Sequence, residues 1–150
     1  MSQTQTTYSF RAIGLLIRVL LVFDTIALLF ASAIHINGAS IPLGAAVFNE
    51  PQMVYAAIVE GLAGGIFAVA SYAALAGRNW AWRSAIIAHV FTILGFLLGL
   101  YATRGGTSPF NYSYHRVMLV IFVAGLILLL LPVGRAAQGP LTHESRGVSA

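Results

Sequence analysis

The stretch AIGLLIRVLLVFDTIALLFASAIHI, residues 12–36, decides the fold of this chain. It is almost entirely apolar, and about 20 apolar residues suffice for an α-helix to cross the hydrocarbon core of a bilayer. Three later stretches share this character, so the sequence predicts a bundle of transmembrane helices. The expected spans cover about residues 12–36, 53–76, 85–103 and 117–133.

The composition agrees with a membrane protein. Apolar residues make up 59% of the chain and charged residues only 8%, whereas about a quarter of the residues in a soluble domain are charged. Outside the spans the ends are short, about residues 1–11 and 134–150. We therefore expect one all-α domain, residues 1–150, built from four antiparallel transmembrane helices without a soluble domain.

The arginines predict the topology. The chain contains no lysine, so its net charge of +4 rests on arginine. In an up-and-down bundle Arg104 and Arg116 fall on one side of the membrane, and the other six arginines fall on the side that contains both termini. The positive-inside rule places the side with more arginines in the cytoplasm. We expect a multi-pass protein of the bacterial inner membrane that contacts membrane lipid. We expect no nucleic-acid partner, because the sequence contains no basic stripe. The arginines of the cytoplasmic side are Arg11, Arg18, Arg78, Arg83, Arg135 and Arg146.

The positions of proline and glycine predict two further features of the architecture. Residues 37–52 contain Gly38, Pro42 and Pro51, so this segment cannot be one regular helix, and we expect it to lie over the outer end of the bundle. The spacings Gly61-x-x-x-Gly65 and Gly95-x-x-x-Gly99 predict close helix approach inside the bundle, with self-association as the alternative.

Ionisable residues within the spans are the main functional signal. Asp24, Glu60 and His89 lie in apolar surroundings, and such residues usually face the bundle interior because charge is costly in lipid. At about 1.5 Å of rise per residue they lie roughly 18, 25 and 9 Å from the cytoplasmic boundary. With His35 and His115 near the outer end they form a ladder whose rungs we expect to be too far apart for direct hydrogen bonds. The expected bridges are water or the hydroxyl groups of Thr25, Ser71, Tyr72 and Thr92.

The first functional hypothesis is ligation of haem or a metal ion. His35 and His115 are expected at similar depth on the first and fourth spans, where facing histidines could hold a cofactor. For a metal ion, Glu60 would complete the ligand set with these two histidines. Haem attachment through Cys-x-x-Cys-His and thiolate metal sites are excluded, because the chain has no cysteine.

A second hypothesis is proton-coupled movement of a small solute. Carboxylates and histidines in series can relay protons through a bundle. Four spans contain no inverted repeat, so a carrier would need several copies of the chain.

The leading hypothesis is a non-catalytic accessory or structural subunit of a larger membrane complex, with Asp24, Glu60 and His89 as its polar intramembrane site. Its expected partners are other membrane subunits or further copies of the chain. Nucleophile elbows and phosphate-binding glycine loops, which many enzymes carry, are absent from the sequence. At the outer edge we expect an ion pair between Glu50 and Arg116.

Overall fold

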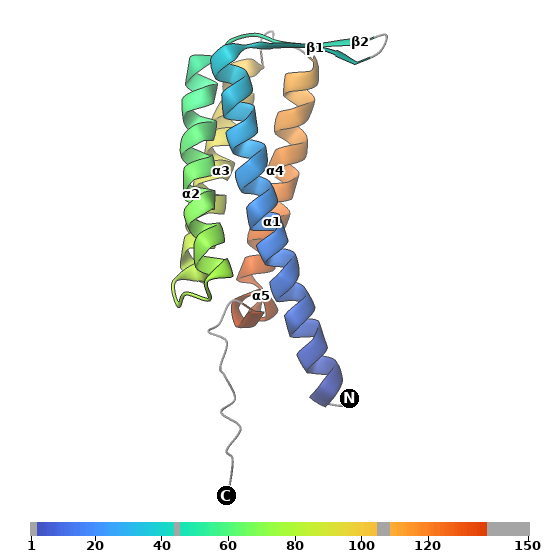
Figure 1. Cartoon of the computed structure of the whole chain (residues 1–150), viewed down its shortest axis with the longest axis vertical. Helices are drawn as coiled ribbons and strands as arrows, with labels where there is room; N and C mark the ends of the chain where they lie inside the picture. The colour runs from blue at the N-terminus through green and yellow to red at the C-terminus, as the bar shows by residue number, and fades with distance from the viewer. Residues whose placement is uncertain (1–2, 44–45, 105–108, 138–150) are drawn as a thin grey trace, which may run out of the picture.

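The computed structural model describes residues 3–43, 46–104 and 109–137. Within these ranges the fold is a bundle of long helices with a small β-hairpin across one end (Figure 1). Four helices are long and apolar enough to cross a membrane, which confirms the number of spans predicted from the sequence. The helices are α1 (Gln3–Asn37), α2 (Val54–Leu75), α3 (Ala81–Thr103), α4 (Pro109–Leu130) and the short α5 (Pro132–Ala137).

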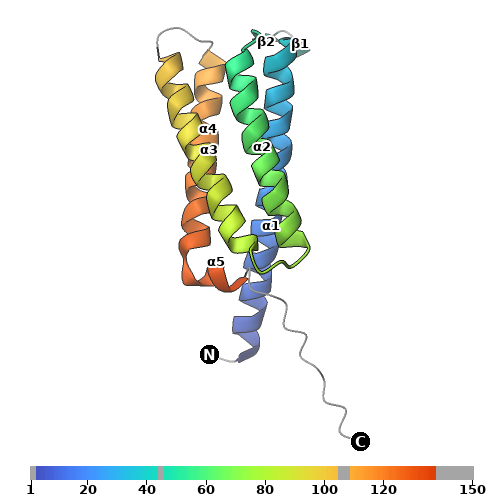
Figure 2. The same cartoon turned by 90° about the vertical axis from the view of Figure 1, so that its left-hand side faces the viewer.

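The hairpin joins α1 to α2. Its strands, β1 (Ala39–Leu43) and β2 (Ala46–Glu50), pair antiparallel, with Ala39 opposite Glu50. Gly38 has a φ of +67°, a left-handed conformation that suits glycine and lets the chain leave α1 sharply. The sequence excluded a single helix here but did not predict strand pairing. The hairpin lies across the end of the bundle where α1 ends and α2 begins, and a short turn joins α2 to α3 at the other end (Figures 1 and 2).

The boundaries of the fourth span differ from the expectation. Helix α4 begins at Pro109, so residues expected to form a loop form its first turns. Pro132 cannot continue an α-helix because it lacks an N–H group, and the chain restarts there as α5, which begins at the end of the expected span and continues into the expected tail. Gly14 of α1 lies against the end of α5, since a Cβ atom at Gly14 would be 3.1 Å from the Ala137 carbonyl oxygen.

The bundle has ionisable residues in its interior and large apolar side chains on its surface, the reverse of a soluble protein. Asp24, Glu60 and His89 are all buried, as the sequence predicted. Large apolar side chains instead cover the outside of all four long helices, and a surface of this kind is stable in lipid but not in water. This arrangement is compatible with a multi-pass membrane protein. Examples of these exposed side chains are Leu15, Phe23, Ile26, Phe30, Leu62, Val69, Ile87, Leu94, Val120 and Ile127.

Some of the glycines in the predicted spacings allow α1 and α2 to approach closely, and others do not. A Cβ atom at Gly64 would lie 2.8 Å from Leu29 Cδ2, and one at Gly61 would lie 3.0 Å from Ser32 Oγ, so both glycines line the contact between α1 and α2. Gly65, the second glycine of the predicted motif, has no neighbour within 4 Å of its Cβ position and does not contribute to this contact.

Arginine side chains lie near aromatic rings at both ends of the bundle. The guanidinium carbon of Arg104 is 3.8 Å from the centre of the Tyr101 ring, a cation–π geometry. Aromatic rings and arginines prefer the interface between lipid and water; membrane lipid as a partner stays a prediction. The other three such contacts are Arg78 with Tyr72, Arg116 with Tyr112, and Arg135 with Trp82.

Candidate functional site

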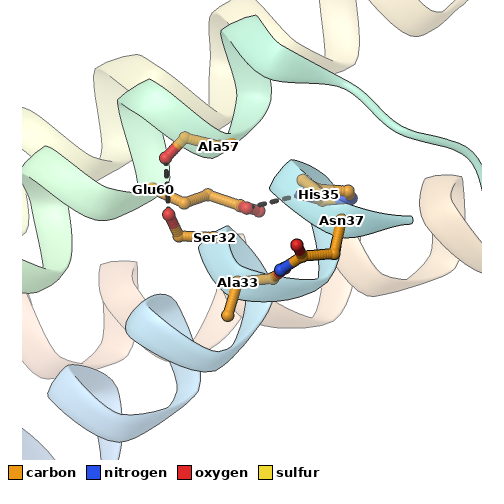
Figure 3. Close-up of polar contacts among 6 residues, drawn as sticks. All are labelled: Ser32, Ala33, His35, Asn37, Ala57 and Glu60. Carbon is orange, nitrogen blue, oxygen red and sulfur yellow. Dashed lines mark hydrogen bonds and ion pairs between the residues drawn. The ribbon is translucent and has the colours of Figure 1, made fainter. Parts of the chain in front are cut away.

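A buried histidine–carboxylate contact joins α1 to α2 at the hairpin end of the bundle. His35 lies in the last turn of α1 and Glu60 in the second turn of α2, and the two residues are 3% and 4% exposed. His35 Nδ1 is 2.6 Å from Glu60 Oε2 (Figure 3). One turn earlier, the Ser32 hydroxyl donates a hydrogen bond of 2.7 Å to the Ala57 carbonyl oxygen. We call His35 and Glu60 the hairpin-end pair.

This direct contact corrects an expectation from the sequence. His35 and Glu60 were expected to be too far apart for a hydrogen bond, because Glu60 was placed well inside the membrane. The contacts of Ser32 with Ala57 and Gly61 place Ser32 level with the turn of α2 that contains Glu60, and His35 lies about one turn farther along α1. The long glutamate side chain then spans the remaining distance.

The contact with His35 uses only one of the two carboxyl oxygens of Glu60. Oε1 is buried and has no hydrogen-bond partner within the described ranges. A buried carboxylate oxygen without a partner is costly, which makes this atom an unusual feature of the bundle interior. The same end of the bundle contains the buried hydroxyl of Tyr114, which also lacks a partner among the described residues.

His115 lies near this region on α4. Its ring packs on Phe96, with 5.1 Å between ring centres, and a Cβ atom at Gly99 would be 2.9 Å from its Nε2 atom. The glycine therefore makes room for the imidazole. Shared ligation of haem or a metal ion by His35 and His115 stays a prediction. The metal-ligand set of His35, Glu60 and His115 stays a prediction as well.

Asp24 and His89 form a second pair, farther from the hairpin. Both residues are almost completely buried, and Asp24 Oδ2 is 4.0 Å from His89 Nε2, beyond hydrogen-bond distance. His89 Nδ1 donates to the Ala85 carbonyl oxygen at 2.8 Å, which leaves Nε2 directed toward the carboxylate. Gly125 is required here, because a Cβ atom on it would lie only 2.5 Å from Nε2.

Three phenylalanines lie between the second pair and the hairpin end. Phe67 packs against His89 with 4.9 Å between ring centres, and Phe122 joins Phe67 to Phe96 at 5.6 and 5.2 Å. Phe96 in turn contacts His115. All three phenylalanines are buried, so a chain of ring contacts runs from His89 of the second pair to His115, and the polar residues form two pairs and not an evenly spaced ladder.

Three of the four hydroxyl groups expected to connect the rungs have other partners. Thr25 bonds to the Leu21 carbonyl oxygen and lies 3.0 Å from Ser71 Oγ, which joins α1 to α2. The Tyr72 hydroxyl is the acceptor for Arg78 at the end of the bundle opposite the hairpin. Thr92 is buried, and its hydroxyl has no partner within the described part of the chain.

The outer-edge ion pair of Glu50 with Arg116 stays a prediction. Glu50 ends β2 and is buried at 4% exposure. Arg116 is exposed, and its guanidinium carbon lies 5.5 Å from the centre of the Tyr112 ring.

A cavity of about 530 Å³ opens beside the hairpin-end pair. Its walls come from the first turns of α2 and the last turns of α3, with His115 of α4 (Figure 2 shows these helices). Ligand pockets in proteins typically measure about 300–1,000 Å³ and are mainly apolar with a few polar groups, and this cavity fits that description. The lining residues are Gln52, Met53, Val54, Tyr55, Ala56, Val59, Glu60, Gly95, Phe96, Leu98, Gly99, Ala102 and His115.

No protein-family model, no curated protein and no solved structure matches this chain. The function therefore has to be argued from the geometry of the described residues.

Proposed function

We propose that this chain is a small non-catalytic membrane protein that works as an accessory subunit of a larger membrane complex. Its four long helices cross the bacterial inner membrane in antiparallel order, with both termini in the cytoplasm. The arginine distribution supports this orientation through the positive-inside rule. The hairpin then lies on the outer side of the membrane, together with the hairpin-end pair.

The observation that carries the proposal is the division of the polar interior into two separate groups. The hairpin-end pair joins α1 to α2 directly, whereas Asp24 and His89 form a pair of their own beside the buried ring of Phe67. Polar contacts of this kind hold membrane helices together in a specific arrangement. A proton-coupled carrier would instead need a continuous polar path, and the buried aromatic rings argue against one through a single chain.

Co-purification from the native membrane tests the proposal. A tagged chain expressed at its natural level is crosslinked in intact membranes, extracted in mild detergent and analysed by gel filtration and mass spectrometry. We expect the chain to elute with other membrane subunits in reproducible stoichiometry, and a tagged unrelated small membrane protein to elute without them. Elution of the crosslinked chain alone, as monomer or homo-oligomer, would overturn the proposal. A visible absorption spectrum of the same sample tests the haem hypothesis.

A further inference from the structure

The end of the bundle opposite the hairpin is basic and contains no described carboxylate. Of the carboxylates within the described ranges, Asp24 lies in the middle of the span of α1, and Glu50 and Glu60 lie at the hairpin end. An anion that binds the chain is therefore attracted to the basic end. The arginines there are Arg11 and Arg18 of α1, Arg78 in the turn after α2, Arg83 of α3 and Arg135 of α5.

Arg18 lies on the face of α1 that meets α2. Thr25 Oγ1 is 3.0 Å from Ser71 Oγ of α2. Arg18 precedes Thr25 by seven residues, which is close to two helical turns. It therefore shares this face of α1, about 10 Å farther from the hairpin. Arg18 is partly buried, and its guanidinium forms no hydrogen bond or ion pair with any described residue.

Arg78 reaches the same side of α2. Its Nη2 atom donates a hydrogen bond of 3.0 Å to the Tyr72 hydroxyl. Its backbone N–H donates to the Ala73 carbonyl oxygen at 2.9 Å, which keeps Arg78 close to the end of α2. Tyr72 follows Gly61, a glycine in contact with α1, by eleven residues, or about three turns. The guanidinium bound to Tyr72 therefore lies on the side of α2 that meets α1, level with Arg18.

The two arginines border a surface that α1 and α2 leave open to lipid. Leu75 follows Ser71 by about one turn on nearly the same face of α2, yet it is 63% exposed, so α1 no longer covers α2 at this level. Figures 1 and 2 show the two helices diverging toward the N-terminus. Beside Arg18 on α1, Leu15 and Val19 are also exposed. A molecule with a charged head and an apolar tail matches two cations beside an apolar surface.

We propose that an anionic phospholipid binds between α1 and α2 at this end of the bundle. Its phosphate group lies between the guanidinium groups of Arg18 and Arg78, and an acyl chain lies along Leu75. Guanidinium groups bind phosphate oxygens through paired hydrogen bonds. A headgroup with net negative charge suits two arginines better than a zwitterionic headgroup, whose positive group they repel. This inference goes beyond the accessory-subunit proposal and does not depend on it.

The test compares two lipids that differ only in the headgroup. The purified chain in mild detergent is mixed with dioleoyl phosphatidylglycerol, which is anionic, or with dioleoyl phosphatidylcholine, which is zwitterionic. Bound lipid is measured by native mass spectrometry. One arginine at an anionic lipid surface changes binding about fivefold, so two should make phosphatidylglycerol bind at least about tenfold more tightly. Equal binding of the two lipids, as expected if an acidic protein segment is the natural occupant, would overturn the proposal, and so would binding of neither.

Variants locate the binding between α1 and α2. Arg18→Gln and Arg78→Gln should each weaken phosphatidylglycerol binding about fivefold. Arg83→Gln removes the same charge from an exposed position at the start of α3 and should leave binding unchanged. If Arg18→Gln does not fold, the variant of the exposed Arg78 and the lipid comparison still decide. Equal losses in the Arg78 and Arg83 variants, or displacement of the lipid by soluble glycerol phosphate, would refute the assignment.

Discussion

Two adjacent glycines in α2 provide a sharp test of the packing between α1 and α2. A Cβ atom at Gly64 would lie 2.8 Å from Leu29 Cδ2 and 3.2 Å from the Leu29 backbone nitrogen, closer than two such atoms normally approach. A Cβ atom at Gly65 would meet nothing within 4 Å. Gly64→Ala should therefore destabilise the bundle, and Gly65→Ala should not.

The size of the effect follows from the difference between the two variants. Both replacements raise helix propensity by the same amount, up to about 1 kcal/mol relative to glycine. Only Gly64→Ala forces α1 and α2 apart, and overpacking of this kind costs about 1–3 kcal/mol. Subtracting one variant from the other removes the propensity effect, so the difference in unfolding free energy should be about 1–3 kcal/mol.

Unfolding in mixed micelles measures this difference. Each purified variant is titrated with sodium dodecyl sulfate, and helicity and tryptophan fluorescence are followed to obtain the free energy of unfolding. We expect Gly64→Ala to unfold at a lower detergent fraction than the wild type, and Gly65→Ala at the same fraction or a higher one. Equal stability of the two variants, or a larger loss in Gly65→Ala, would show that this face of α2 does not contact α1.

Three further predictions use the same unfolding measurement. A double-mutant cycle of His35→Ala with Glu60→Gln should give a coupling energy of about 1–2 kcal/mol, as expected for a polar contact between membrane helices; additive effects would indicate that the two side chains do not touch. Gly125→Ala should cost about 1–3 kcal/mol by crowding the imidazole, and part of this loss should disappear when it is combined with His89→Ala. If Gly125→Ala lowers the unfolding free energy by the same amount with and without His89→Ala, the contact between Gly125 and the imidazole would be contradicted. Trp82→Phe should cost about 0.5–1.5 kcal/mol, because the indole N–H donates a 2.8 Å hydrogen bond to a backbone carbonyl oxygen of α4; a variant as stable as the wild type would argue against that bond.

The sequence predicted the transmembrane helices well because their signal is local. Each span is a continuous apolar run, and its length alone identifies it. The burial of Asp24, Glu60 and His89 was predictable for a similar reason, since a charge in lipid is costly wherever the helix is placed. His35 and His115 are also buried; the shared ligation expected of them stays a prediction.

The contacts among these residues were not predictable, because they depend on how the helices are rotated and shifted against one another. The direct bond between His35 and Glu60 arises from the level at which α1 and α2 meet, and this level is set by the close approach at Gly61 and Gly64. The glycine spacing indicated such an approach but paired Gly61 with Gly65, which faces away. Nothing in the sequence marked Phe67 as part of the chain of ring contacts between His89 and His115.

The β-hairpin was missed for another reason. Gly38, Pro42 and Pro51 marked the segment as irregular, and proline does not favour a strand because it cannot donate a hydrogen bond to the neighbouring strand. A two-stranded ribbon accommodates such a residue because each strand has an unpaired edge. The start of α4 at Pro109 was hidden by the polar residues before His115, which made its first turns resemble a loop.

The most direct test of the account is a disulfide between α1 and α2, because the natural chain has no cysteine. A Cβ atom at Gly61 would lie 3.8 Å from Ser32 Cβ, the mean separation in disulfides. The register that brings His35 to Glu60 therefore predicts that the double variant Ser32→Cys, Gly61→Cys crosslinks on mild oxidation in membranes. Ser32→Cys with Gly65→Cys, one turn farther along α2, should stay reduced. Crosslinking of the second variant instead of the first would contradict the register and, with it, the proposed site.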